Sequence, residues 1–144
     1  MTRDKSVIEE RLPRKIARIL LSLGFLVAGV GHFRATAAFA AIVPSFLPDP
    51  RLLVYISGVA ELLLALLLFV PRYRQVAGLG LILLMVAVWP ANWNMALHAE
   101  LYPRAGSLLL WIRVVLQIPM AFWAAYAGGL WPFASRATAR SEIL

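Results

Sequence analysis

The sequence predicts an all-α protein: a four-transmembrane-helix bundle with both termini cytoplasmic and a short interfacial helix in the first outer loop. Three observations support this fold class. Of the 144 residues, 62% are hydrophobic and only 15% are charged; soluble domains average about 45–50% and about 25%. Four apolar stretches are long enough to cross a bilayer, and the basic residues are unequally shared among the connecting segments. The composition excludes a soluble enzyme and an ordinary cytosolic binding domain.

We expect one integral membrane domain over residues 1–144. An α-helix rises about 1.5 Å per residue, so a hydrocarbon core of about 30 Å requires about 20 largely apolar residues. Four stretches meet this requirement, and we predict spans at about 16–33, 52–70, 76–94 and 107–128. A basic tail, residues 1–15, precedes the first span, and a second tail, residues 129–144, follows the last. Both tails are expected in the cytoplasm.

Proline residues mark several of these boundaries. Pro50 comes just before the second span and Pro71 just after it, where a missing backbone N–H is easily tolerated. Pro90 and Pro119 fall inside the third and fourth spans, and membrane helices accommodate proline as a kink. Between the first two spans, Thr36 is placed to cap a short helix that would lie at the membrane interface.

The basic residues predict the orientation. One side of the membrane receives ten of the fourteen, in the two tails and the second loop: Arg3, Lys5, Arg11, Arg14, Lys15, Arg18, Arg72, Arg74, Arg136 and Arg140. The other side receives three, Arg34, Arg51 and Arg104, and the fourteenth, Arg113, falls inside the fourth span. Because cytoplasmic segments carry the excess of Lys and Arg, both termini are expected inside the cell. The net charge of +7 then follows from topology, and nucleic acid is not an expected partner.

Several kinds of site are not expected. The chain has no cysteine, which excludes disulfides, Cys-ligated zinc and iron–sulfur clusters. We expect no metal site and no covalently bound cofactor. A bis-histidine haem is disfavoured because His98 falls in an outer loop, whereas His32 lies within a span. The sequence also lacks a nucleotide-binding loop, a nucleophile elbow and an HExxH motif.

Every predicted span contributes a polar side chain to the same half of the membrane. Counted from the span ends, the set is His32, Glu61, Asn92, Arg113 and Gln117. An ionisable group inside hydrocarbon costs about 2.5–3.5 kcal/mol on insertion scales, so each needs a partner or a function. We therefore expect these five residues to line a ligand-binding cavity that opens to the outside.

Helical spacing predicts how the spans pack. Gly24, Ala28 and Gly31 form a stripe of small residues on the first span, which permits close helix contact. Ser57 lies one turn before Glu61 and extends a second small or polar stripe. These four small residues are the predicted helix-packing positions.

The depth of Glu61 and Arg113 predicts an ion pair between them. The pair could be purely structural, fixing the register of two helices without any chemistry. In other interpretations Arg113 reaches the headgroups alone, Asn92 only caps or bonds a neighbouring helix, and His32 is an interfacial donor. The sequence does not separate a functional from a structural role for Glu61 and Arg113.

Short motifs resemble a known family over residues 16–125. In order they are Gly31-His32-Phe33, Phe39, Ile42-Val43-Pro44, Leu47-Pro48, Ile56-Ser57-Gly58-Val59-Ala60-Glu61, Pro71 and Trp89-Pro90-Ala91-Asn92. This series is similar to DoxX-like proteins. The resemblance implies a small four-helix integral membrane protein; some relatives are associated with quinone-linked sulfur oxidation or redox and stress complexes, and a distant vertebrate branch assists channel assembly. The matching positions are His32, Glu61, Pro90 and Asn92, whereas Arg113 and Gln117 come from depth and spacing alone.

The favoured function is a small membrane subunit that binds a quinone or similar amphipathic molecule in a redox-linked complex. Glu61 and His32 would handle protons, and Arg113, Asn92 and Gln117 would hydrogen-bond a carbonyl oxygen. A partner would have to carry the electrons. One alternative is a non-enzymatic assembly or interaction factor for another membrane protein, and a second is a small proton-coupled exporter. Enzymatic activity itself stays open.

The favoured function also predicts the partners of the protein and its location in the cell. The partners are the lipid bilayer and another membrane protein or redox subunit, with a homo-oligomer as a further alternative. The expected location is the bacterial cytoplasmic membrane, with both termini inside.

Overall fold

The computed structural model describes residues 12–130, and within them every regular element is helical. The elements in order are α1 (Leu12–Arg34), α2 (Thr36–Ala41), α3 (Pro50–Leu67), η1 (Pro71–Tyr73), α4 (Arg74–Leu97), η2 (Ala99–Leu101) and α5 (Ser107–Gly128). Four of them, α1, α3, α4 with the preceding η1, and α5, are long and apolar enough to cross a membrane. The prediction of four such helices is confirmed. The two predicted tails lie largely outside the described residues.

The ends of the long helices follow local chemistry. Asp49 accepts a hydrogen bond from the Leu52 amide through its side chain (3.1 Å), and Pro50 occupies the first turn, so α3 begins there. The helix ends at Leu67, before the predicted limit at residue 70, and Pro71 then opens the short η1 turn. Gly129, with φ of 78°, ends α5 in the left-handed conformation that favours glycine.

The short helix after α1 is present, but Thr36 does not cap it. The N-cap of α2 is Ala35, which makes no side-chain cap hydrogen bond. The Thr36 hydroxyl instead donates to the carbonyl oxygens of His32 (2.8 Å) and Phe33 (3.2 Å). The reason is that only one residue separates α2 from α1, so the last carbonyls of α1, which lack helical partners, lie within reach of this hydroxyl.

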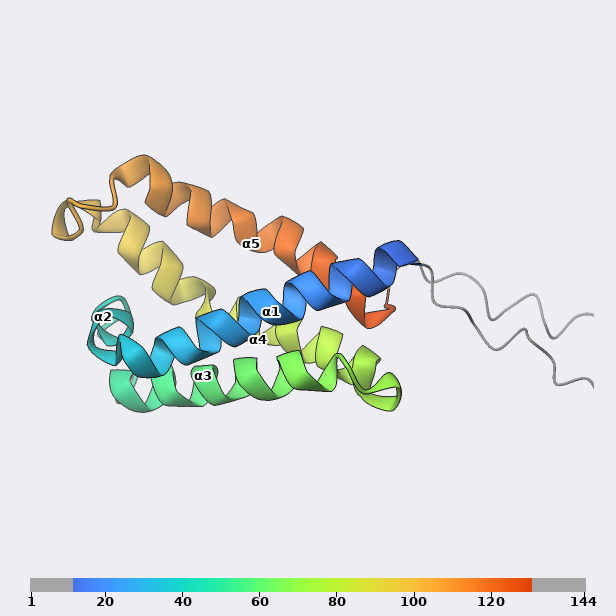
Figure 1. Cartoon of the computed structure of the whole chain (residues 1–144). Coiled ribbons are helices and arrows are strands. Elements are labelled where there is room, and N and C mark those ends of the chain that lie inside the picture. The colour runs from blue at the N-terminus through green and yellow to red at the C-terminus, as the bar shows by residue number, and fades with distance from the viewer. Residues whose placement is uncertain (1–11, 131–144) are drawn as a thin grey trace, which may run out of the picture.

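The four long helices form two tightly packed pairs. Figure 1 shows α1 alongside α3 and α4 alongside α5, with the two pairs approaching each other where α1 begins and α5 ends. At the other end the pairs diverge, and α2 lies there. The end near the start of α1 is called the closed end below, and the end near α2 is called the open end.

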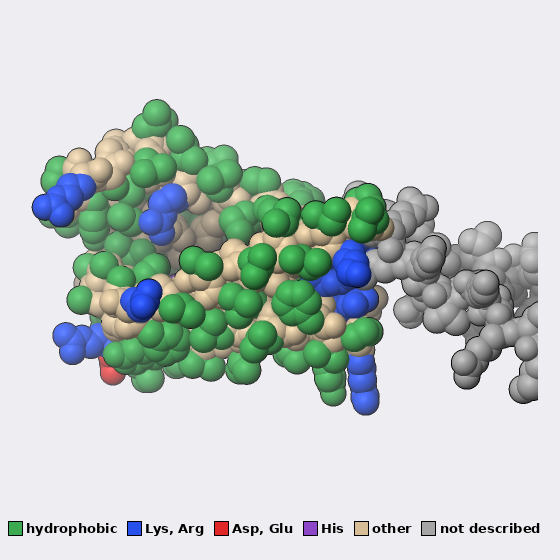
Figure 2. All heavy atoms as spheres, in the orientation of Figure 1, with side chains coloured by type: hydrophobic (Ala, Val, Ile, Leu, Met, Phe, Trp, Pro, Cys, Tyr) green, Lys and Arg blue, Asp and Glu red, His purple; other side chains and the backbone are tan. Residues whose placement is uncertain are grey.

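The outer surface is mainly apolar along its length. Leu63, Leu66, Leu83, Val115 and Phe122 each expose more than half of their surface. In Figure 2 hydrophobic side chains cover most of the visible face, while basic side chains gather mainly toward its two ends. A face this apolar is suited to lipid and would be unusual on a water-soluble monomer.

A core of small residues holds the closed end together. Ala65, Ala77, Ala124 and Ala127 are fully buried there, together with Leu68 and other large residues of the same cluster: Leu21, Phe25, Leu81 and Met85. The backbones of α4 and α5 touch, since a Cβ added to Gly78 would lie 2.9 Å from the Ala124 carbonyl oxygen and 3.0 Å from the Gly128 Cα. Small residues therefore set the distance between α4 and α5.

The crossing of α1 and α3 uses glycines other than the predicted stripe. A Cβ on Gly58 would lie 2.9 Å from the His32 Cβ, and a Cβ on Gly29 would lie 3.1 Å from the Gly58 carbonyl oxygen. A Cβ on Gly24 would meet nothing within 4 Å, and one on Gly31 would meet only the Phe39 ring. The prediction that Gly24 and Gly31 are close-packing positions is wrong, because the face of α1 that meets α3 carries Gly29.

Two side chains link α1 to α5 at the closed end. The Trp123 indole donates to the Ala17 carbonyl oxygen (2.9 Å), and the guanidinium of Arg18, only 3% exposed, donates to the Ala127 carbonyl oxygen (3.4 Å). A cation at the last turn of α5 also complements the negative end of that helix. Together with the buried cluster, these bonds keep the two helix pairs in contact at this end.

Candidate functional site

A cavity of about 500 Å³ lies between the two helix pairs, toward the open end. Its walls come from all four long helices and from the segment around α2. The lining is mostly apolar; its polar members are His32, Ser57, Glu61, Asn92, Arg113 and Gln117. All five residues predicted from membrane depth therefore line one cavity. Its size lies within the range of about 300–1,000 Å³ found for small-molecule sites.

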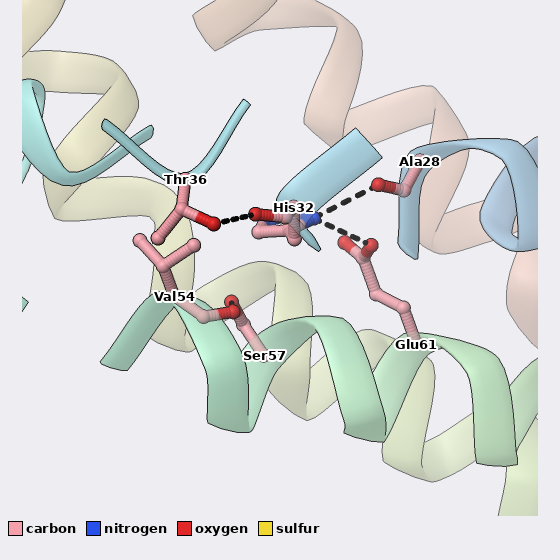
Figure 3. Close-up of polar contacts among 6 residues, drawn as sticks. All are labelled: Ala28, His32, Thr36, Val54, Ser57 and Glu61. Carbon is pink, nitrogen blue, oxygen red and sulfur yellow. Dashed lines mark hydrogen bonds and ion pairs between the residues drawn. The ribbon is translucent and has the colours of Figure 1, made fainter. Parts of the chain in front are cut away.

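His32 and Glu61 form the most buried polar contact of this cavity. Glu61 extends from α3 toward His32 on α1 (Figure 3), with 3.2 Å between the His32 Nδ1 and the Glu61 Oε2. The same Nδ1 lies 2.9 Å from the Ala28 carbonyl oxygen. Because a carbonyl oxygen can only accept, Nδ1 is the protonated nitrogen of this hydrogen bond. The two residues are 8% and 6% exposed, so the contact is shielded from solvent.

The predicted pairing of Glu61 with Arg113 is not formed. The Arg113 guanidinium donates instead to the Asn92 Oδ1 across 3.2 Å and is exposed, so it occupies the rim of the cavity. Both side chains line the same space, but Glu61 meets the imidazole on the neighbouring α1. The sequence misjudged this pair because depth fixes a residue's height along the membrane and leaves its direction around the helix axis to packing.

Gln117 presents an acceptor to the cavity. Its Nε2 donates to the Met85 carbonyl oxygen (3.1 Å), which fixes the orientation of the amide. Its Oε1 is buried and has no hydrogen-bond partner. This bond uses one of the two N–H groups of the amide, so the expected donation from Gln117 to a ligand carbonyl stays a prediction.

Ala28 and Ser57 contribute to the cavity wall. Ala28 lines the cavity and supplies the carbonyl oxygen that holds His32. Ser57 is buried and lines the cavity too, while its hydroxyl donates to the Val54 carbonyl oxygen one turn earlier (3.0 Å). Ser57 also neighbours Gly58, the position of closest approach to α1. Of the four predicted packing residues, these two lie at the α1–α3 side of the cavity.

The segment around α2 forms one end of the cavity and is tied to the other helix pair. The Phe39 ring stacks on His32 with 4.1 Å between ring centroids, and Ile42 is buried against the cavity. Asn94 of α4 donates to the Ile42 carbonyl oxygen (3.0 Å), and the Tyr102 hydroxyl donates to the Ala41 carbonyl oxygen (3.1 Å). We call residues 35–43, held by these bonds, the α2 strap.

Sequence reasoning missed Asn94 and Tyr102 as parts of the site. No pattern in the sequence separates them, because Asn94 lies two residues beyond Asn92 and points to another element, and Tyr102 is one of several aromatic residues near a span end. Only the proximity of the α2 strap to α4 and η2, which are distant in sequence, gives them a role.

The cavity combines an apolar body with a small number of directed polar atoms. Such a lining binds molecules that carry a hydrocarbon portion and one polar head. A buried carboxyl beside an imidazole can also exchange a proton with such a head. Arg113 at the rim adds one fixed positive charge.

Comparison with known proteins identifies a family. No curated protein and no solved structure matches the chain significantly. A family model described as "Domain of unknown function (DUF8561)" matches residues 21–127. The matched region runs from within α1 to the penultimate residue of α5 and includes every polar residue of the cavity. The chain belongs to the DUF8561 family.

Proposed function

We propose that this protein is a multi-pass membrane protein that binds an amphipathic small molecule, of the quinone and quinol kind, in the cavity between its helix pairs. The observation that carries the proposal is the convergence of His32, Glu61, Asn92, Arg113 and Gln117, from four separate helices, on one largely apolar cavity of about 500 Å³. An isolated structural ion pair would not require all four helices to direct polar side chains into the same space.

The site is proposed to work as the binding part of a redox-linked complex. The His32–Glu61 contact provides a place where a ligand head exchanges a proton, and the apolar walls receive its tail. Electrons must come from a partner protein, since the chain has no cysteine with which to hold an iron–sulfur cluster or form a redox disulfide. A relationship to DoxX-like proteins stays part of this proposal and rests on the short motifs quoted above.

Binding is the first test. The wild-type protein, purified in detergent, is titrated with a short-chain alkyl quinone and its quinol while the thermal unfolding midpoint is followed. We expect saturable stabilisation, because a ligand that binds only the folded state raises its stability. Arg113→Ala and Glu61→Ala should weaken binding about tenfold or more. Arg104→Ala, a cation of the outer connection that does not line the cavity, is the matched control and should bind as the wild type does.

Two outcomes would replace the proposal. If neither compound stabilises the wild-type protein at saturation, ligand binding is wrong and the polar cluster is structural. If the protein purified from its native membrane carries a stoichiometric protein partner and no small molecule, an assembly or interaction factor becomes the better description.

We further propose that the closed end of the bundle, and with it both termini of the chain, faces the cytoplasm. The ten-to-three distribution of Lys and Arg across the two sides supports this orientation. Because the chain has no native cysteine, single cysteines give an unambiguous test. Ser45→Cys, exposed near the α2 strap, should react with an impermeant thiol reagent in intact cells, whereas Gln75→Cys, exposed at the start of α4, should react only after lysis. The reverse pattern would invert the proposed topology.

A further inference from the structure

The polar atoms of the cavity that lack partners are of one chemical kind. The Oε2 of Glu61 and the Oε1 of Gln117 are both buried and accept no hydrogen bond from the described residues. Nδ1 of His32 lies 3.2 Å from the Glu61 Oε2, but its N–H is directed to the Ala28 carbonyl oxygen at 2.9 Å. Both unfilled positions are therefore hydrogen-bond acceptors.

Several donors of the inner cavity already bind oxygens of the protein. The His32 Nδ1–H is held by the Ala28 carbonyl oxygen, and one of the two N–H groups of the Gln117 amide is held by the Met85 carbonyl oxygen. The Ser57 hydroxyl donates to the Val54 carbonyl oxygen. Further N–H groups remain on the Asn92 and Gln117 amides and on Arg113, which is exposed at the rim.

A buried acceptor without a partner is costly, and a bound molecule that supplies the missing donor recovers that cost. A head group that can only accept, such as an ether or a quinone carbonyl, would face these oxygens without forming a hydrogen bond. A hydroxyl provides one donor for each oxygen it approaches. An ammonium group is disfavoured, since the Arg113 cation lines the same cavity and the carboxyl of Glu61 already lies beside an imidazole.

We infer that the cavity selects amphipathic molecules with an uncharged hydrogen-bond-donating head, a phenol or a quinol hydroxyl, over counterparts whose oxygens only accept. The inference rests on the proposed binding function and gives it a direction. In a quinone–quinol couple the site would hold the reduced form more tightly. The Glu61 Oε2 and the Gln117 Oε1 are the atoms that would accept the hydrogen bond from the ligand hydroxyl.

The test compares a 4-alkylphenol with the 4-alkylanisole of the same chain length, which differ by one hydroxyl hydrogen replaced by methyl and undergo no redox change under assay conditions. Binding is measured on the full chain in lipid nanodiscs by tryptophan fluorescence. Dissociation constants are expressed as mole fractions in the bilayer, so that the different partitioning of the two compounds is removed. An alkylammonium of equal chain length is the third probe.

In the wild-type protein we expect the phenol to bind about tenfold more tightly than the anisole, the effect of one or two buried hydrogen bonds. Glu61→Gln, which replaces one acceptor oxygen by an N–H donor, should reduce that ratio to about two or less, and Gln117→Met should reduce it by about threefold. Glu100→Gln and Gln75→Met make the same chemical changes at exposed positions outside the cavity and should leave the ratio unchanged. Because the ratio is taken within each variant, a loss of folded protein does not alter it.

The outcomes separate the inference from the proposed function. If the anisole binds as tightly as the phenol, or the alkylammonium binds more tightly than both, the selectivity is wrong while binding of amphipathic molecules stands. If none of the three probes binds, the proposed function and the inference fail together. A preference for phenol that survives both Glu61→Gln and Gln117→Met would overturn the assignment of these two oxygens.

Discussion

The closed and open ends of the bundle bury different kinds of residue. At the closed end the helices meet through alanines and glycines, with Ala65, Ala77, Ala124 and Ala127 fully buried. At the open end α4 and α5 meet through large rings: the Trp89 indole donates to the Val114 carbonyl oxygen (3.2 Å), and the Trp93 and Trp111 rings meet edge to face.

The difference explains why the cavity lies where it does. Small residues let backbones approach closely and leave little space, whereas large side chains between α4 and α5 keep that pair together without drawing it onto α1 and α3. The space that results is lined by the polar residues of the site and bounded by the α2 strap. The closed end holds the two helix pairs together, and the open end leaves the space in which a ligand would bind.

The largest effect on stability is expected from a substitution at the closed end. Gly78→Ala should lower the free energy of unfolding by about 2–3 kcal/mol, because the new methyl group would press on the backbone of α5, which cannot move aside as a flexible side chain could. The measurement is the thermal unfolding midpoint in a fixed detergent. Gly24→Ala is the matched control: with nothing within 4 Å it should leave stability unchanged or raise it by about 0.5 kcal/mol. Equal losses in the two variants would remove the proposed distinction between packed and open glycines.

The next effect concerns the partner of Glu61 at the open end. A double-mutant cycle of Glu61→Gln with His32→Gln should give a coupling energy of about 1–2 kcal/mol, since the two side chains are in contact and shielded from solvent. The same cycle with Arg113→Gln should be additive within about 0.5 kcal/mol. Chemical or thermal unfolding of the four proteins in each cycle provides the numbers. If Glu61 coupled more strongly to Arg113 than to His32, the ion pair predicted from membrane depth would be the correct one.

The smallest effect concerns the α2 strap. Tyr102→Phe removes the hydroxyl that donates to the Ala41 carbonyl oxygen and should cost about 0.5–1 kcal/mol locally. The amides of the strap should then exchange with deuterium faster, while those of the closed end keep their rates. Tyr73→Phe, at an exposed tyrosine of η1, is the control and should leave both regions unchanged. Faster exchange throughout the bundle would mean that the strap and the closed end unfold as one unit.

Much of the fold could be predicted because membrane helices leave a strong sequence signal. A run of apolar residues long enough for the bilayer, bounded by proline or glycine, has few alternatives. The helix α5 illustrates this: its bounds, Ser107 and Gly128, are those expected from the sequence. By contrast, the sequence placed the close contacts of α1 on Gly24 and Gly31, and the structure has Gly29 in that position. Several small residues on one helix offer alternative faces, and only the neighbouring helix selects between them.

The composition of the candidate site could also be predicted, whereas its contacts could not. Depth along a helix follows from counting residues, so His32, Glu61, Asn92, Arg113 and Gln117 were assigned to one half of the membrane and all line one cavity. Which of them touch depends on the rotation of each helix about its axis. That rotation is set by Gly29 against Gly58, which brings α1 to α3 and therefore His32 to Glu61.

The sequence by itself determined the number of long apolar helices and the kinds of polar residue they carry, because both follow from local hydrophobicity and from distances along one helix. The tertiary structure alone decided that Glu61 meets His32, that Gln117 offers an oxygen, and that the strap is tied to α4 and η2. These features depend on contacts between helices that are far apart in sequence, such as the close approach of Gly29 and Gly58 that brings His32 to Glu61.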